Sequence, residues 1–182
     1  MMDVYADLHI HIGRTEKGNA VKITGSKTLT LRNILQFASS RKGLDMIGVI
    51  DCHVPEVLNE IDELIQQGKL TELTGGGLRF RQTTLILGSE IEIYDPQCLG
   101  PIHVLTYFQT LEKMRDFSQW MSHHVKNISL STQRIYVDGR ALQKKVHELD
   151  GLFIPAHVFT PFKSLYGKGV KESLREVFDP KY

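Results

Sequence analysis

The sequence has little of several features that would place it in a special class of proteins. Its 182 residues include only two cysteines, Cys52 and Cys98, which lie in different segments. Two separated cysteines build neither a disulfide framework nor a CxxC zinc knot. No apolar run approaches the roughly 18 residues of a membrane span, and no signal peptide is recognisable. The sequence therefore predicts a soluble, cytoplasmic protein.

Charge of one sign is not in excess either. Lys and Arg number 22 against 21 for Asp and Glu, a formal net charge of +1. A nucleic-acid partner would thus need a local basic patch rather than a basic protein. Repeats and low-complexity segments are also absent from the sequence. We expect residues 1–182 to form one domain.

Short apolar runs rich in β-branched residues alternate with helical patterns, which predicts an α/β fold. The expected strands are 4–11, 46–52, 84–93, 102–108 and 152–157, with two short strands at 70–74 and 78–82. The expected helices are 31–42, capped by Thr28 or Thr30, then 55–67, 111–125, and 139–149, capped by Asp138. The alternation fits a barrel or an open sheet, and in either a site belongs at the C-terminal ends of parallel strands.

Two histidines alternate with apolar residues in the first expected strand. Residues at i and i+2 of a strand point to the same side, so His9 and His11 present both imidazoles to one place, with Asp7 in line behind them. Such a pair can bind a metal ion. It can equally be two polar residues on a wet face, so the rest of the chain has to decide.

Further candidate ligands lie at or near the ends of other strands. They are Asp51 and His53 at the end of the second strand, Glu90 within the third, His103 in the fourth and His157 at the end of the last. Each of these residues alone has another explanation. A histidine can be a hydrogen-bonded core residue, and Glu90 and Glu92, which share a strand face, can lie on the solvent-exposed face of an edge strand. Together they predict a metal site. Imidazole and carboxylate ligands suit zinc, manganese or iron, and a bridging carboxylate is typical of a two-metal hydrolytic site.

The order of these motifs resembles that of the PHP (polymerase and histidinol phosphatase) superfamily. The resemblance implies a distorted (β/α)7 barrel holding two or three divalent ions (Zn, Mn or Fe, with Mg possible). It implies that His9 and His11 bind the first ion, that Glu90 bridges to the second, and that His103 and His157 complete the second. Glu90, His103 and His157 are then also the catalytic residues. His53, with Asp51, would serve a third ion.

The sequence departs from the PHP pattern in two places. Cys52 separates Asp51 from His53, where the family usually has adjacent Asp and His, and this favours His53 over Asp51 as a ligand. No histidine follows His157, so the late Asp-x-His motif of the family is missing, and Asp179 does not replace it. Glu16 is the nearest candidate for a further ligand of the third ion. We therefore expect a C-terminally incomplete barrel, the N-terminal part of a longer protein, that need not be active alone.

Within the superfamily, the chain most resembles the endonuclease Q group and related uncharacterised bacterial PHP proteins. The supporting stretches are 7–11, the polar insertion 13–30, 48–53 and 155–161. The resemblance implies metal-dependent phosphodiester hydrolysis, with a nick 5′ of deaminated bases or abasic sites. The alternatives are a small-molecule phosphatase of the histidinol-phosphatase type and a non-catalytic, metal-stabilised module.

A loop after His157 carries the residues expected to contact DNA. Residues 160–171 include Lys163, Lys168 and Lys171 together with glycines and aromatic residues. Lysines neutralise phosphate, glycines let backbone amides approach it, and aromatic rings stack on exposed bases. Arg14, at the start of the polar insertion, is a second phosphate-binding candidate. The alternative is a solvated loop; we expect DNA, and the rest of a longer chain, as partners, and no membrane.

Overall fold

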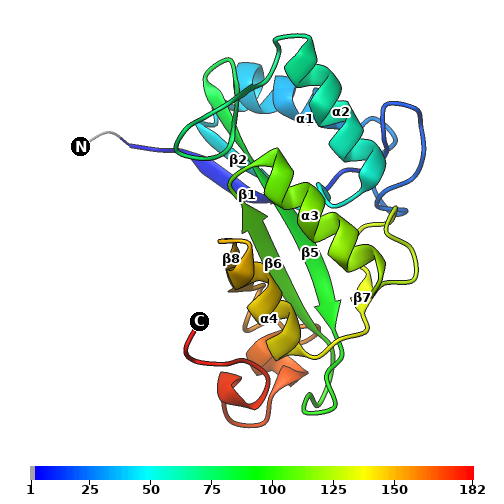
Figure 1. The fold of residues 1–182 in the computed structure, drawn as a ribbon, viewed down its shortest axis with the longest axis vertical. Coiled ribbons are helices and arrows are strands. Elements are labelled where there is room, and N and C mark those ends of the chain that lie inside the picture. The colour runs from blue at the N-terminus through cyan, green and yellow to red at the C-terminus, as the bar shows by residue number, and fades with distance from the viewer. Residues whose placement is uncertain (1–2) are drawn as a thin grey trace.

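The protein is described by a computed structural model covering residues 3–182, and it has a mixed α/β architecture (Figure 1). Its strands are β1 (Ala6–Ile10), β2 (Met46–Val49), β3 (Thr71–Glu72), β4 (Leu78–Phe80), β5 (Thr83–Ile93), β6 (Ile102–Phe108), β7 (Arg134–Ile135) and β8 (Leu152–Pro155). Its α-helices are α1 (Leu31–Phe37), α2 (Pro55–Gln66), α3 (Leu111–Ser122) and α4 (Gly139–Glu148). Within residues 3–182, no helix is long and apolar enough to span a membrane.

The helices begin where the sequence predicts. Thr30 caps α1 by accepting a hydrogen bond from the Asn33 N–H, and Asp138 caps α4 by accepting one from the Ala141 N–H. After Phe37 the chain continues as a π-helical segment, Ala38–Lys42, and stops at Gly43, whose φ of 63° is left-handed. All four expected helices are confirmed. Three of them end one to three residues before the predicted C-terminus.

The strand directions correct one expectation. β1, β2 and β5 are parallel, as an α/β succession requires. However, β6 is antiparallel to β5, and β8 is antiparallel to β6. The connection 94–101 between β5 and β6 contains no helix and is too short for the crossover that parallel strands need. Of these five strands only β6 runs against the others, since β8 returns to the direction of β5. The expected placement of the site at the C-terminal ends of parallel strands is therefore wrong for His103, which lies near the start of β6.

The sheet of the described residues is not closed. β1 pairs only with β2 and β8 only with β6, so both are edge strands of the sheet. The predicted (β/α)7 barrel is thus not confirmed. The observed form is an open sheet that runs β1, β2, β5, β6, β8, with the short β3–β4 pair and β7 attached along β5.

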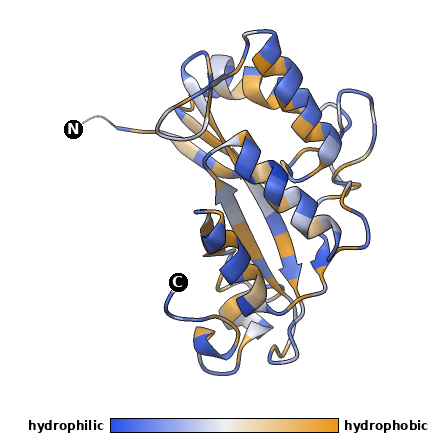
Figure 2. Ribbon diagram, in the orientation of Figure 1, coloured by the Kyte–Doolittle hydropathy of each residue, from blue (hydrophilic) through white to orange (hydrophobic). Residues whose placement is uncertain are grey.

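Alternate residues of β5 separate the two faces of the sheet. Leu85, Leu87 and Ile91 belong to the main core, which they share with side chains from all four helices. Figure 2 shows the mixture of hydrophobic and hydrophilic residues expected of helices that pack through one side. The opposite face carries a small apolar cluster of Ile50, Leu105, Tyr107 and Ala156. The polar residues of the candidate site stand on this second face.

Candidate metal centre

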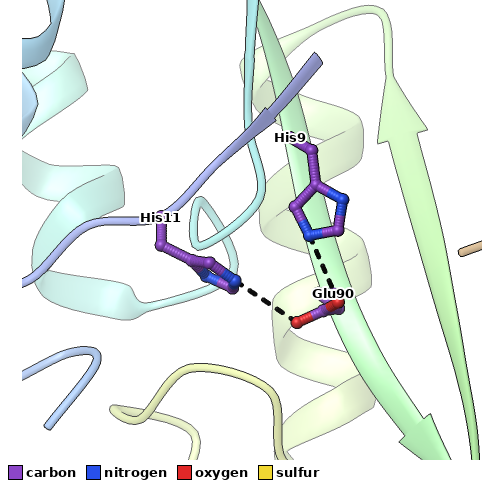
Figure 3. A group of neighbouring side chains, drawn as sticks. All are labelled: His9, His11 and Glu90. Carbon is purple, nitrogen blue, oxygen red and sulfur yellow. Dashed lines mark ion pairs between the residues drawn. The ribbon is translucent and has the colours of Figure 1, made fainter. Parts of the chain in front are cut away.

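His9 and His11 approach the same carboxylate from the first strand. His9 lies in β1 and His11 just after it, and their ring centroids are 5.6 Å apart. His9 Nε2 lies 3.2 Å from Glu90 Oε1, and His11 Nε2 lies 3.4 Å from Glu90 Oε2 (Figure 3). The strand is irregular here, since its pairing with β2 shifts register between Asp7 and Ile10. Asp7 Oδ1 accepts a hydrogen bond from the His9 N–H, so it supports the backbone of His9.

Two more imidazoles reach Glu90 from the other side. His103 Nδ1 lies 3.2 Å and His157 Nε2 lies 3.6 Å from Glu90 Oε1. The hairpin explains how a residue near the start of β6 gets there: His103 pairs directly with Glu92, near the end of β5, and Leu105 pairs with Glu90. His157 follows β8 with a φ of 32°, which is uncommon for a residue with a side chain. The structure therefore brings together His9, His11, Glu90, His103 and His157.

The five side chains form two sets of three possible ligands that share Glu90. One set is His9, His11 and Glu90; the other is Glu90, His103 and His157, and in each the ligand atoms lie within 4.8 Å of one another. Bonds of about 2 Å at tetrahedral angles place two ligands of one ion about 3.3 Å apart. The nitrogen–oxygen distances of 3.2–3.6 Å are close to this spacing. The donor set thus fits two divalent ions that share one carboxylate.

Burial and hydrogen bonds control the charges of the centre. Burial alone would raise the pKa of Glu90, but hydrogen bonds from His103, His11 and His9 hold it far below its ordinary value. Burial would lower the pKa of His11, yet hydrogen bonds to Asp51 and Glu90 raise it to about 9. The pKa of His103 is likewise raised against burial, by Glu90 and Glu92. Protons therefore occupy the positions that metal ions would take, so metal binding must release them.

Asp51 and His53 lie on different sides of this arrangement. Asp51 Oδ2 is 3.0 Å from His11 Nδ1 and accepts the Ile12 N–H, while its Oδ1 is buried without a hydrogen-bond partner among the described residues. His53 is fully buried, with Nδ1 2.8 Å from Ser89 Oγ and Nε2 3.2 Å from the Leu130 carbonyl. Burial lowers the pKa of His53. Asp51 thus contacts the centre directly, whereas His53 is joined to it only through the core.

Three residues absent from the predicted ligand set contact the centre. Glu92 Oε2 lies 3.2 Å from His103 Nε2, Thr132 Oγ1 donates to Glu90 Oε2 at 2.7 Å, and Ser131 Oγ is 3.1 Å from His11 Nδ1. The alternation Glu90-x-Glu92 was a signal for Glu92, since both carboxylates must share a face. No sequence pattern identifies Ser131 and Thr132, which reach the centre from the loop before β7.

The predicted phosphate-binding residues are dispersed. Lys163 Nζ pairs with Glu92 Oε2 at 2.9 Å, and the Lys168 Nζ lies 5.0 Å from the centre of the Phe162 ring. The Lys171 side chain is exposed. Arg14 instead donates to the Gly18 carbonyl within its own loop. Glu16 belongs to neither ligand set: its carboxylate accepts the Arg32 N–H.

Comparison with solved structures shows what this fold is similar to. A crystal structure of endonuclease Q in complex with a 27-mer duplex carrying an abasic lesion at the active site superposes with a TM-score of 0.75 and 27% identity, covering 97% of this chain and 40% of that chain. The lesion-specific endonuclease PfuEndoQ from Pyrococcus furiosus gives a TM-score of 0.73 at 27% identity, covering 96% of this chain and 39% of that one. The chain has an endonuclease Q-like fold.

Two related proteins match most of this chain, and both are uncharacterized. The uncharacterized protein YqxK of Bacillus subtilis (strain 168) is 64% identical over 180 residues, which is 99% of this chain and 46% of that protein. The uncharacterized protein MJ0043 of Methanocaldococcus jannaschii is 28% identical over 156 residues, 85% of this chain and 16% of that protein. The chain thus spans less than half the length of these relatives. No protein-family model matches it.

Proposed function

We propose that this chain carries the metal centre of a PHP-type, metal-dependent phosphodiesterase that nicks DNA 5′ of deaminated bases or abasic sites. The observation that carries the proposal is the position of Glu90, shared by two pairs of histidines on one face of the sheet. When bound, two divalent ions there would supply an activated water and stabilise the extra charge on the phosphoryl group. The likeness to endonuclease Q supports DNA as the substrate.

The residues of the chain prepare this site in specific ways. Asp51 engages His11 Nδ1, so that His11 Nε2 faces Glu90. Glu90 directs Oε1 toward His9, His103 and His157 and Oε2 toward His11. Fixing the ring orientation of a ligand in this way is a usual role of carboxylates beside metal sites.

The site is also open enough for a polymer. The side chains of His9 and His157 are 37% and 30% exposed, so the imidazoles at both ends of the centre reach solvent. A small-molecule phosphatase would need a closed pocket instead. Leaving His157, the chain enters the loop with Lys163, Lys168 and the exposed rings of Phe159 and Phe162, where a DNA backbone could bind.

A nicking assay with matched duplexes tests the proposal. Duplexes with one uracil, hypoxanthine or abasic site, and an undamaged control, are incubated with this chain or with YqxK and with Mn²⁺, Zn²⁺ or Mg²⁺. We expect lesion-dependent nicks on the 5′ side that chelation abolishes. Because Glu90 belongs to both ligand sets, Glu90→Gln should lower metal affinity by about 100-fold or more, beyond the effect of losing an outer partner.

The control variant is Glu148→Gln, which removes a carboxylate on α4 that pairs with Lys144 and Lys145. It should leave metal content and nicking unchanged. Metal titration of the chain by calorimetry reports on the centre even if the chain alone does not nick. The proposal fails if Glu90→Gln binds metal as the parent does, or if neither this chain nor YqxK cleaves any lesion duplex with any of the ions.

A further inference from the structure

A second carboxylate of β5 stands on the far side of His103. Glu92 Oε2 lies 3.2 Å from His103 Nε2 and 2.9 Å from Lys163 Nζ, so one oxygen contacts both a candidate ligand and a lysine of the adjoining loop. The Glu92 side chain is 20% exposed. It belongs to neither candidate ligand set.

The register of the hairpin produces this arrangement. Glu92 pairs directly with His103, and Glu90 lies two residues back on the same face of β5. The His103 ring is consequently held between two carboxylates, with Nδ1 at 3.2 Å from Glu90 and Nε2 at 3.2 Å from Glu92. A neutral imidazole has one N–H and one lone pair, and an ionised carboxylate can only accept. With the N–H at Nε2 directed to Glu92, the Nδ1 lone pair faces Glu90 and the second ligand set.

The same carboxylate fixes the loop. The His103 N–H donates to the Lys163 carbonyl at 2.9 Å, and the Lys163 side chain returns to Glu92. Lys163 holds this position with a φ of 55°, so its backbone is strained where the loop meets the strand.

We propose that Glu92 is a positioning residue of the metal centre: it selects the ring nitrogen that His103 presents to the second ligand set, and it holds the Lys163 ammonium at the rim of the site. The inference rests on the proposed metal function. It assigns to Glu92 no contact with substrate or metal. Carboxylates in this role typically contribute about 10- to 100-fold to metal affinity.

Two substitutions separate the two tasks. Glu92→Gln keeps an acceptor for His103 Nε2 but loses the charge that holds Lys163, whereas Glu92→Met keeps the length and has no strong acceptor. In Mn²⁺ and Zn²⁺ titrations, we expect Glu92→Met to lower the affinity for one of the two ions by about 10- to 100-fold. The affinity for the other ion should stay within a few-fold of the parent value. Glu92→Gln should restore most of that loss. Lys163→Met should leave both affinities within a few-fold.

The tautomer of His103 gives a readout that a merely structural role would not change. ¹⁵N NMR of the histidine rings, in the zinc-bound chain and in the metal-free chain above the titration of His103, should show the proton on Nε2 in the parent and in Glu92→Gln. In Glu92→Met this preference should be lost. Glu148→Gln, the same change in a remote carboxylate, should alter none of these measurements.

The outcomes distinguish this inference from the proposed function. If the parent binds no metal, the proposed function fails, while the metal-free spectra still test the role of Glu92. Parent-like tautomer and metal affinity in Glu92→Met would overturn the inference. An equal loss of affinity for both ions in Glu92→Met would also overturn it, because a positioning role predicts a loss confined to the ligand set that contains His103.

Discussion

At the scale of single residues, the centre is a carboxylate surrounded by imidazoles. Glu90 is buried and has four histidine nitrogens within 3.2–3.6 Å, so its negative charge is balanced by protons or by metal ions. Which of the two is present sets the pH dependence of the stability. A proton on a histidine with a raised pKa stabilises the folded chain at low pH, and a metal ion does so at high pH.

The stability of the metal-free chain should therefore fall as the pH rises. The pKa of His11 is about 9 in the folded chain against an ordinary value of 6.5. Its contribution to the free energy of unfolding is fully present below about 6.5 and is lost as the pH rises through about 9. Urea titrations with a chelator should show this decline in the parent and a smaller one in His11→Asn.

The control for that experiment is His147→Asn, whose ring packs on Tyr182 away from the centre. It should keep the steep decline of the parent. With Zn²⁺ present the trend should reverse, because metal binding requires neutral histidines. Parallel pH profiles for the parent and His11→Asn would show that His11 does not carry the effect.

Sequence reasoning found the residues of the centre whose position depends on local geometry. His9 and His11 share a side because they are two apart in a strand, and Glu90 follows an apolar run that fixes its strand. Local geometry could not show which of Asp51 and His53 contacts the centre. Both follow β2 closely, but the turn after it directs Asp51 to His11 and buries His53 against Ser89. Thr132 arrives from a distant loop, which no local pattern encodes.

At the scale of the elements, apolar periodicity predicted where strands lie but not which way they run. Residues 102–108 have the same apolar pattern whether β6 is parallel or antiparallel to β5. The direction depends on the connection 94–101, which carries no helix. This reversal places His103 opposite Glu92. The site therefore gains a residue from the start of a strand, where parallel strands would have offered only their ends.

The contact between α2 and the polar insertion has a pH dependence of its own. Glu60 of α2 is 8% exposed; its Oε1 accepts the Glu16 N–H at 2.6 Å, and its Oε2 has no partner within the described part of the chain. Burial, together with the neighbouring charges of Glu16, Glu56 and Glu63, raises the pKa of Glu60 to about 7. The folded chain thus favours the protonated form.

Replacing Glu60 should stabilise the chain at neutral pH. The favourable contribution of protonated Glu60 is fully present below about 4.5, its ordinary pKa, and is lost as the pH rises through about 7. Glu60→Gln cannot ionise, so its free energy of unfolding should exceed that of the parent by an amount that grows between these two values. Denaturant titrations across pH 4 to 8 measure this. A constant difference, as expected for the exposed Glu148→Gln, would contradict it.

At the scale of the whole molecule, the open sheet leaves the candidate metal centre on a face that solvent reaches. The strands β1 and β8, which bear or adjoin His9, His11 and His157, are edge strands of this sheet. A chain with a net charge of +1 has no general attraction for DNA, so the proposed DNA binding has to come from groups near this face. The loop after His157 offers lysines and exposed aromatic rings, and these two kinds of side chain should affect DNA binding differently.

The lysines should act through phosphate alone. Lys168→Ala and Lys171→Ala should each make log affinity less steep against log salt, by about 0.9 on duplex DNA and about 0.7 on single strands. Lys163→Ala should change the slope less, since Lys163 is already paired with Glu92. The losses should be nearly equal for every DNA sequence, with constant metal content. Lys144→Ala on α4 is the control, and an unchanged slope for Lys168→Ala and Lys171→Ala would make the loop a solvated connection.

The aromatic rings should instead act on unstacked bases. Phe159 and Phe162 are 80% and 69% exposed, and Phe159 stacks on Tyr166 with ring centroids 5.8 Å apart, so a flat apolar surface adjoins the centre. Stacking of a base on such a ring contributes about 1–3 kcal/mol, so Phe159→Ala or Phe162→Ala should weaken binding about 5- to 150-fold. This loss should appear for single-stranded DNA and for duplexes with an unpaired or abasic position, but not for an undamaged duplex.

The slope of log affinity against log salt should stay constant in these two variants, because no charge is removed. Fluorescence anisotropy at several salt concentrations measures both quantities, and an equal loss on the undamaged duplex would show that these rings do not contact bases.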